Sequence, residues 1–313
     1  MSADRAFPPA WPEGKRFAFT IFDDPDSQTW EADREVYAFL KDHGFRTTKG
    51  VWPMGPIRTP SDYGLTCAHP GYTDWIRSLV DAGFEAGYHN ATSHTCTREE
   101  TEEGLELFRR LFGAYPRTMA HHYNCDENLY WGEHRLSGWR RTAYNLLTRY
   151  QNHNHFFGHV EKHPYFWGDL CRDRIEYCRS FAFGDINTFK VWPHFPYHDP
   201  DRPYVRLWYP SSEGSNQERF CHTIAEANQE RLEEEGGLCI MYTHFGHGYY
   251  DGALNKRFVA LIERLAQRPA WFAPVGTVLD YVRSRQAPIV LDSRMRAQLE
   301  TRWLKHKVFY GTA

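Results

Sequence analysis

Acidic and histidine side chains stand at three points where an apolar run of the sequence ends. Asp23 and Asp24 follow the run RFAFTIF, His89 and His94 follow the run FEAGY, and His244 follows the run LCIMYT. Two histidines and a carboxylate form a nitrogen and oxygen ligand set that suits zinc or another divalent first-row metal, and such a set leaves a position open for water. The sequence therefore predicts a catalytic metal site built at strand ends.

The elements that must position these groups alternate between strand and helix. Strands are predicted over residues 16–22, 45–51, 84–88, 117–122, 238–243 and 271–275. Helices are predicted over 30–43, 73–82, 97–113, 215–236, 253–267 and 277–285, and two of them begin with the capping boxes Thr97-x-x-Glu100 and Ser215-x-x-Glu218. This alternation predicts a parallel sheet or an α/β barrel, in which the site forms at the carboxyl ends of the strands.

The chain is expected to contain one catalytic domain over residues 15–287. Between residues 124 and 210 the periodicity is weak and His, Tyr, Trp and Pro are frequent, which predicts a loop-rich insertion that covers the site. Residues 1–14 are interpreted as an N-terminal extension and residues 288–313 as a C-terminal appendage.

Composition narrows the class of protein. The net charge of −3 provides no basic surface for a phosphate backbone, so no nucleic-acid partner is expected. The seven cysteines are scattered and form no C-x-x-C pair, which indicates neither a disulfide framework nor a thiolate zinc site. The sequence has no apolar run of signal-peptide or membrane-spanning length, which predicts a cytoplasmic protein.

Three motifs resemble those of the polysaccharide deacetylases, the NodB-homology superfamily or carbohydrate esterase family four. FTIFDDPD resembles the first motif (T-F-D-D-G), EAGYHNATSH resembles the second (G-N-H-T-x-S-H), and CIMYTHFGHG, trailed by PVGTVLDYV, resembles the last. The resemblance covers roughly residues 15–285. It implies a single distorted (β/α)7 barrel with long loop insertions.

The resemblance also implies a role for each residue of the site. One divalent ion, zinc first and cobalt, nickel, manganese or iron as alternatives, would be held by Asp24, His89 and His94. Three groups would act on the substrate, namely the general base Asp23, the general acid His244 and the backbone N–H of Tyr123, which would stabilise an oxyanion.

The first two motifs depart from the family pattern in two ways. The family places three residues between its two histidines, whereas four residues separate His89 from His94. Pro25 replaces the glycine of the first motif, and Asp26 then adds a third carboxylate that competes with Asp24 for the metal.

The third family motif (F-R-P-P-Y-G) would fall on residues 119–124, where no arginine is present to orient the base. Either His121 or His122 fills that space, or an arginine reaches it from elsewhere in the chain, and both histidines are predicted to contact the substrate. Trp167 and Trp192 of the loop-rich insertion are predicted to form a platform for a sugar ring, and the alternative interpretation is packing within the loops.

The predicted function is hydrolysis of the amide of an amino sugar by a metal-dependent N-deacetylase or N-deformylase. The resemblance favours a small, lipid-linked or nucleotide-linked amino sugar of surface-polysaccharide (O-antigen) biosynthesis. Two alternatives remain open. One is a carbohydrate-binding barrel that has lost turnover, and the other is a metal-dependent amidase that acts on a carbon–nitrogen bond outside sugars.

Overall fold

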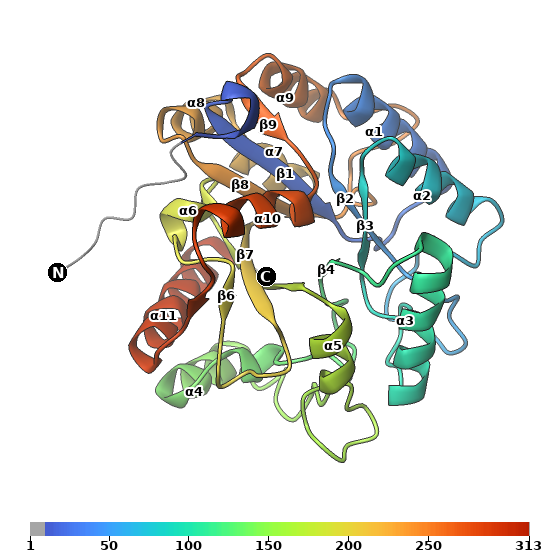
Figure 1. Ribbon diagram of the computed structural model, residues 1–313, viewed down its shortest axis with the longest axis vertical. Helices are drawn as coiled ribbons and strands as arrows, with labels where there is room; N and C mark the ends of the chain where they lie inside the picture. Colours follow the sequence, from blue (N-terminus) through green and yellow to red (C-terminus); the bar gives the residue numbers. More distant parts are fainter. Residues whose placement is uncertain (1–9, 313) are drawn as a thin grey trace.

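Seven parallel strands close into a barrel in the computed structural model, which describes residues 10–312 (Figure 1). The order around the barrel is β7-β5-β4-β3-β2-β1-β8, and β8 pairs with β7 to complete the ring. The strands are β1 Phe17–Asp23, β2 Thr48–Val51, β3 Glu85–Tyr88, β4 Thr118–Met119, β5 Tyr177–Phe183, β7 Leu207–Ser212 and β8 Leu238–Thr243. The predicted (β/α)7 barrel is therefore confirmed.

Helices surround the strands on the outside of the barrel (Figure 1). Those that follow the first strands are α1 Trp30–Asp42, α2 Tyr72–Asp81, α3 Arg98–Phe112, α4 Gly138–Leu147, α5 Gly168–Arg174 and α6 Thr188–Val191. The later ones are α7 Gln217–Thr223, α8 Glu226–Glu234, α9 Lys256–Ala266, α10 Val275–Arg285 and α11 Ser293–Tyr310. Each long helix buries one apolar stripe against the strands, as Phe258, Leu261 and Leu265 do in α9.

Strand β1 is the central element of the site. All seven of its residues are buried, and it pairs with β8, β2 and the short strand β9 Ala270–Phe272. In this register Asp23 lies opposite Thr243 of β8 and Lys49 of β2. The acidic turn that follows β1 therefore lies at the same end of the barrel as the residues that follow β8.

The two predicted capping boxes had different outcomes. Helix α3 begins with the reciprocal box of Thr97 and Glu100, as predicted. The second box is wrong, because the N-cap of α7 is Asn216, whose side chain accepts from the backbone N–H of Arg219. The single helix predicted over 215–236 is also divided into α7 and α8, and the buried amide of Gln229 donates to the backbone carbonyl at the break.

The segment 124–210 contains more regular structure than the periodicity indicates. Besides the 3-10 helix η2 Gly132–Arg135 and helices α4 to α6, it contains the whole of barrel strand β5 and the start of β7. The short strand β6 Tyr197–His198 pairs antiparallel with β7. The sequence pattern did not predict strand β5, because Arg179 and Ser180 interrupt its apolar run.

The C-terminal segment packs on the barrel. Strand β10 Ile289–Val290 pairs with β6, and Leu299 and Trp303 of α11 are buried. The buried carboxylate of Glu300 accepts from Ser137 and Arg140. Of the N-terminal extension, residues 1–9 lie outside the described residues, and Pro12–Gly14 form the short helix η1. None of the helices in residues 10–312 is long and apolar enough to cross a membrane.

Candidate active site

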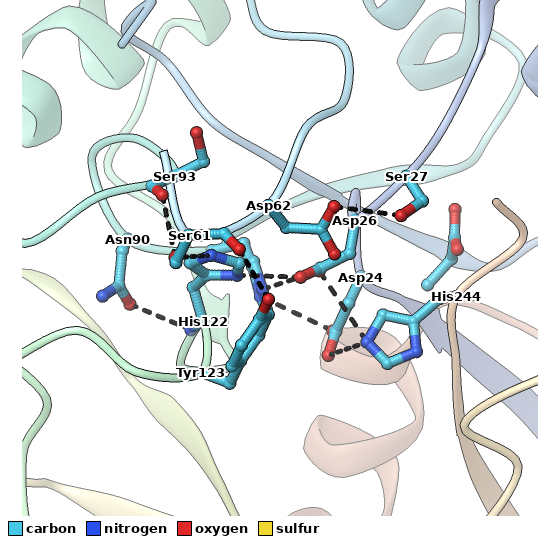
Figure 2. A network of polar contacts seen from close by, with 12 residues as sticks. Asp24, Asp26, Ser27, Ser61, Asp62, Asn90, Ser93, His122, Tyr123 and His244 are labelled. Atoms are coloured by element: carbon cyan, nitrogen blue, oxygen red, sulfur yellow. Dashed lines mark hydrogen bonds and ion pairs between the residues drawn. The ribbon is translucent and has the colours of Figure 1, made fainter. Parts of the chain in front are cut away.

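The carboxyl ends of β1, β3 and β4 bring Asp26, His89 and His122 together. Asp26 lies in the turn after β1, His89 follows β3 directly, and His122 follows β4. The distance from Asp26 Oδ1 to His122 Nδ1 is 2.9 Å (Figure 2). The distance from Asp26 Oδ2 to His89 Nε2 is 3.2 Å. One ligand atom from each of the three residues lies within 4.8 Å of the others, which is a span that a single metal ion bridges.

The polar atoms of this cluster fit a cation. Both carboxylate oxygens of Asp26, both ring nitrogens of His89 and Nδ1 of His122 are buried, and apart from the close approaches between the carboxylates and the two rings they have no hydrogen-bond partner among the described residues. Buried polar atoms are normally paired with groups outside such a cluster as well, so five atoms that face only one another favour a bound cation. An N/N/O set of this kind suits zinc or another divalent first-row metal.

The surroundings of the cluster favour the ligating forms of its members. Burial lowers the pKa of His89, which favours the neutral ring that binds metals. Burial alone would raise the pKa of Asp26, but the adjacent His122 and His89 hold that pKa well below its usual value. His122 Nε2 lies 2.7 Å from Ser61 Oγ, a contact that fixes the ring and leaves Nδ1 facing Asp26.

Asp24 faces the same space but is held by an arginine. Both of its oxygens accept from Arg179 of β5, at 3.0 and 2.6 Å, and both side chains are almost fully buried. Burial opposes the charge of Arg179, but Asp24 raises the pKa of the guanidinium well above its usual value. Of the predicted triad, Asp24 and His89 lie side by side, with 3.6 Å between Asp24 Oδ1 and His89 Nδ1, and Asp24 also belongs to a second group with Asp26 and His244 that could hold a metal ion.

His244 also faces the acidic side chains of the cluster. Its Nδ1 donates to the backbone oxygen of Ser215 over 2.6 Å, so Nε2 points toward the acids (Figure 2). Nε2 is 3.8 Å from Asp24 Oδ2 and 3.7 Å from Asp26 Oδ2. The sequence placed His244 at the end of β8, and the structure brings it to the cluster as predicted.

Asp23 lies outside this space. Its oxygens accept from Gln28 Nε2 (2.8 and 2.7 Å), Tyr37 Oη (3.0 Å), Lys49 Nζ (3.0 Å) and the backbone N–H of Phe245 (2.8 Å). A carboxylate with this many buried donors has no lone pair left for a substrate water. The geometry therefore does not support Asp23 as the general base.

The network around Asp23 gives a stability prediction. Lys49 also lies 3.5 Å from the buried Asp33, and burial raises the pKa of Asp33 to about 7 although Lys49 opposes that shift. Lys49→Met leaves both carboxylates without their cation, so we expect it to lower the free energy of unfolding by about 3 kcal/mol. Urea unfolding measures this loss.

An exposed ion pair provides the control for that measurement. Arg16 pairs with Glu233 at the surface and its side chain is 59% exposed, so Arg16→Met is expected to change the free energy of unfolding by less than about 1 kcal/mol. Equal effects of Arg16→Met and Lys49→Met would contradict a structural role for the buried network.

His94 is also placed away from the cluster. Its Nε2 accepts from the backbone N–H of Ile57 over 3.1 Å, and its Nδ1 lies 2.9 Å from the backbone oxygen of Thr95. Both ring nitrogens are thus used within the protein. The four residues between His89 and His94 carry the second histidine past the site, and the ring from β4 takes that place.

A cavity of about 280 Å³ opens over the cluster. Of the residues predicted from sequence, it is lined by Asp24, His89, His121, Tyr123 and His244. Those that do not line it are Asp23, His94, His122, Trp167 and Trp192. Trp167 is fully buried, and its indole N–H donates to the backbone oxygen of Glu127. The geometry therefore supports the alternative interpretation, in which Trp167 packs within the loops.

His121 and Tyr123 occupy different parts of the cavity. His121 is buried with both ring nitrogens unpartnered, and burial together with the charge of Arg135 puts its pKa well below the usual value. Tyr123 is half exposed at the rim, and its hydroxyl donates to the backbone oxygen of Ser61 over 2.6 Å.

Sequence reasoning missed the roles of three residues in this arrangement. His122 ends the predicted strand 117–122, so the same strand-end rule that selected His89 applied to it. Asp26 was recognised only as a competitor of Asp24. Arg179 is an arginine that reaches the site from elsewhere in the chain, as one alternative held, but the sequence did not identify it, because it lies inside a strand that was not predicted and 155 residues from its partner.

Comparisons with known proteins agree on the fold. No protein-family model and no curated protein matches the sequence. A putative polysaccharide deacetylase from Mycobacterium smegmatis matches the structure with a TM-score of 0.52 and 14% identity, over 92% of this chain and 97% of that chain. A probable polysaccharide deacetylase from Pseudomonas aeruginosa PAO1 gives a TM-score of 0.49 and 15% identity, over 91% of this chain and 96% of that chain.

The Mycobacterium smegmatis protein has a TM-score above 0.5, and its identity is low enough that it establishes the fold alone. The resemblance stated from the motifs is thereby confirmed at the level of architecture. What the residues do on that architecture follows from their own geometry.

Proposed function

We propose that this chain is a metal-dependent hydrolase that removes an acyl group, acetyl or formyl, from the nitrogen of an amino sugar. The observation that carries the proposal is the convergence of five buried atoms of Asp26, His89 and His122, which have no hydrogen-bond partner outside the cluster, beside Asp24 and His244. Zinc is the first candidate ion, with cobalt, nickel, manganese or iron as alternatives.

The side chains divide the work of amide hydrolysis. Asp26, His89 and His122 would hold a divalent ion, which would supply Lewis acidity to make a water more acidic and to polarise the amide carbonyl. Asp24 is the proposed general base, because it faces the cavity and Arg179 keeps it oriented. It accepts a proton from the attacking water.

His244 is the proposed general acid. An amine leaves an amide poorly unless it is protonated. His244 lines the cavity, and its Nε2 lies 3.8 Å from Oδ2 of Asp24, the proposed base. The backbone N–H of Tyr123 at the rim remains our proposed contribution to the oxyanion hole.

The lining of the cavity supports a sugar substrate. Trp131 and Tyr242 line it, each with one ring face against an arginine (Arg135 and Arg179), and the aromatic surface left at the cavity suits the apolar face of a sugar ring. We propose these two residues for the role predicted for Trp167 and Trp192. We assign the substrate to the small, lipid-linked or nucleotide-linked amino sugars of surface-polysaccharide synthesis, as the sequence resemblance implies.

Metal removal and substrate profiling test this function together. Purified protein loaded with zinc or cobalt is incubated with N-acetyl and N-formyl amino sugars, and released acetate or formate is measured. We expect release that a chelator abolishes and that added metal restores, because the Asp26, His89 and His122 atoms have no other partner.

Three other outcomes would contradict the proposal. Glycan binding without any release would indicate a carbohydrate-binding barrel. Release from cyclic ureides or imides but from no amino sugar would indicate an amidase for bonds outside sugars. Release that survives complete metal removal would exclude the metal-dependent mechanism.

A further inference from the structure

Arg135 is a buried guanidinium that no carboxylate neutralises. It is the last residue of η2, only 8% of its surface is exposed, and its Nε has no hydrogen-bond partner. No ion pair joins it to an acid within residues 10–312. Burial lowers the pKa of Arg135 to about 10, which still leaves the side chain charged at neutral pH.

Other arginines in the interior of this protein are each paired with a carboxylate. Arg179 is paired with Asp24, and both Arg202 and Arg296 are paired with Asp199. A buried charge is strongly unfavourable unless it is paired and hydrogen-bonded. Arg135 therefore differs from these arginines in having no anion supplied by the described part of the chain.

Arg135 lies where a ligand can reach it. It lines the cavity of about 280 Å³ that contains Asp24 and His244, and it also lines a second, much smaller cavity of about 20 Å³. Its guanidinium carbon lies 3.3 Å from the centre of the Trp131 ring, and this stacking fixes the orientation of the guanidinium group. The N–H groups at the edge of a stacked guanidinium remain free to bind oxygen atoms in pairs.

The carboxylates of the site are already committed to other groups. Asp24 accepts both hydrogen bonds of Arg179, and Asp26 faces the two histidines of the cluster. Asp62 accepts from Ser27 Oγ over 3.0 Å (Figure 2). The missing anion must therefore come from a bound molecule.

We propose that the substrate carries an anionic oxygen group, a carboxylate or a phosphate, and that Arg135 binds this group while the amide lies at the cluster. The inference rests on the proposed function, because it assumes that the cavity receives the substrate. It makes Arg135 a specificity-determining residue, and the expected substrate is an acidic sugar derivative instead of a neutral one.

Equilibrium binding to zinc-loaded protein tests the inference without turnover. Four deacylated amines serve as probes in two matched pairs, which are muramic acid with its methyl ester and glucosamine 6-phosphate with glucosamine. We expect at least one acidic member to bind about tenfold or more tightly than its neutral partner in calorimetry, because hydrogen bonds to a charged group are strong. The two pairs distinguish a carboxylate from a phosphate.

Variants connect the preference to one side chain. Arg135→Met should remove the difference between acidic and neutral probes, and Arg135→Lys should retain part of it. Arg135→Met is expected to keep the melting temperature, because no buried anion loses its partner. The matched control is Arg172→Met, which removes a half-exposed arginine and should leave the preference unchanged.

Three results would overturn the inference. One is equal affinity for both members of each pair, or no binding of any acidic probe. Another is a preference that survives Arg135→Met. The third is Arg135-dependent binding of sodium acetate or formate alone, which would show a site for the released acyl product. Acetate release from amino sugars without any acidic preference would retain the proposed function and reject only this inference.

Discussion

His122→Ala is expected to release the metal and abolish turnover, whereas His94→Ala is expected to retain both. His122 Nδ1 faces Asp26 Oδ1 at 2.9 Å, while both ring nitrogens of His94 are engaged by backbone groups. Loss of a residue that only orients a ligand typically weakens metal binding by about 10–100-fold, so loss of a ligand should cost more than about 100-fold. Metal analysis after dialysis measures the difference.

Comparing His122→Ala with His94→Ala distinguishes the ligand set that contains His122 from the set that contains His94. Ser61→Ala serves as a milder variant, because it removes only the hydroxyl that lies 2.7 Å from His122 Nε2. We expect its metal affinity to fall between those of wild type and His122→Ala. Stoichiometric metal in His122→Ala together with loss of metal in His94→Ala would restore the triad that the sequence motifs imply and reject the one that the geometry favours.

Asp24→Asn is expected to retain the metal and lose about 10²–10⁴-fold in kcat. The amide keeps the shape of Asp24 but cannot accept the proton of the attacking water, and a positioned general base contributes a factor of this size. Arg179→Met should also lower kcat, because both oxygens of Asp24 then lose their buried donors. Steady-state kinetics with parallel metal analysis measures both effects.

Two carboxylate variants act as controls for Asp24. Asp62→Asn changes another acid that lines the cavity, and its kcat should remain within about tenfold of wild type, because no acid–base role is assigned to it. Asp23→Asn should affect stability more than chemistry, since Asp23 is enclosed by Lys49 and Tyr37. A folded, metal-loaded Asp23→Asn protein that is inactive beside an active Asp24→Asn would reverse the assignment of the base.

The sequence predicted the barrel because its strong signals are local. Apolar runs such as LCIMYT indicate buried strands whatever the rest of the chain does, and β8 was predicted with its observed bounds. Alternation of strands and helices favours a parallel barrel, and polar residues at strand ends mark its active end. The positions of Asp24, His89 and His244 at the cavity follow from these rules.

Local sequence signals did not decide which of several neighbouring acidic residues faces the cavity. Successive residues of an extended chain point to opposite sides, so Asp23 and Asp24 cannot both face the cavity. The register of β1 against β2 places Asp23 beside Lys49, and the turn then carries Asp24 and Asp26 inward. Motif order alone assigned Asp23 as the base, because no motif contains the lysine that neutralises it.

By itself the sequence determined the fold, the end of the barrel where the site forms and the kinds of side chain gathered there. Only the tertiary structure decided which of those side chains meet. His122 lies beside Asp26 and His89 while His94 does not, and Arg179 reaches Asp24 across 155 residues of sequence. The physical reason is that a ligand set depends on contacts within a few ångströms between segments far apart in the chain, and only strand pairing and barrel closure determine those distances.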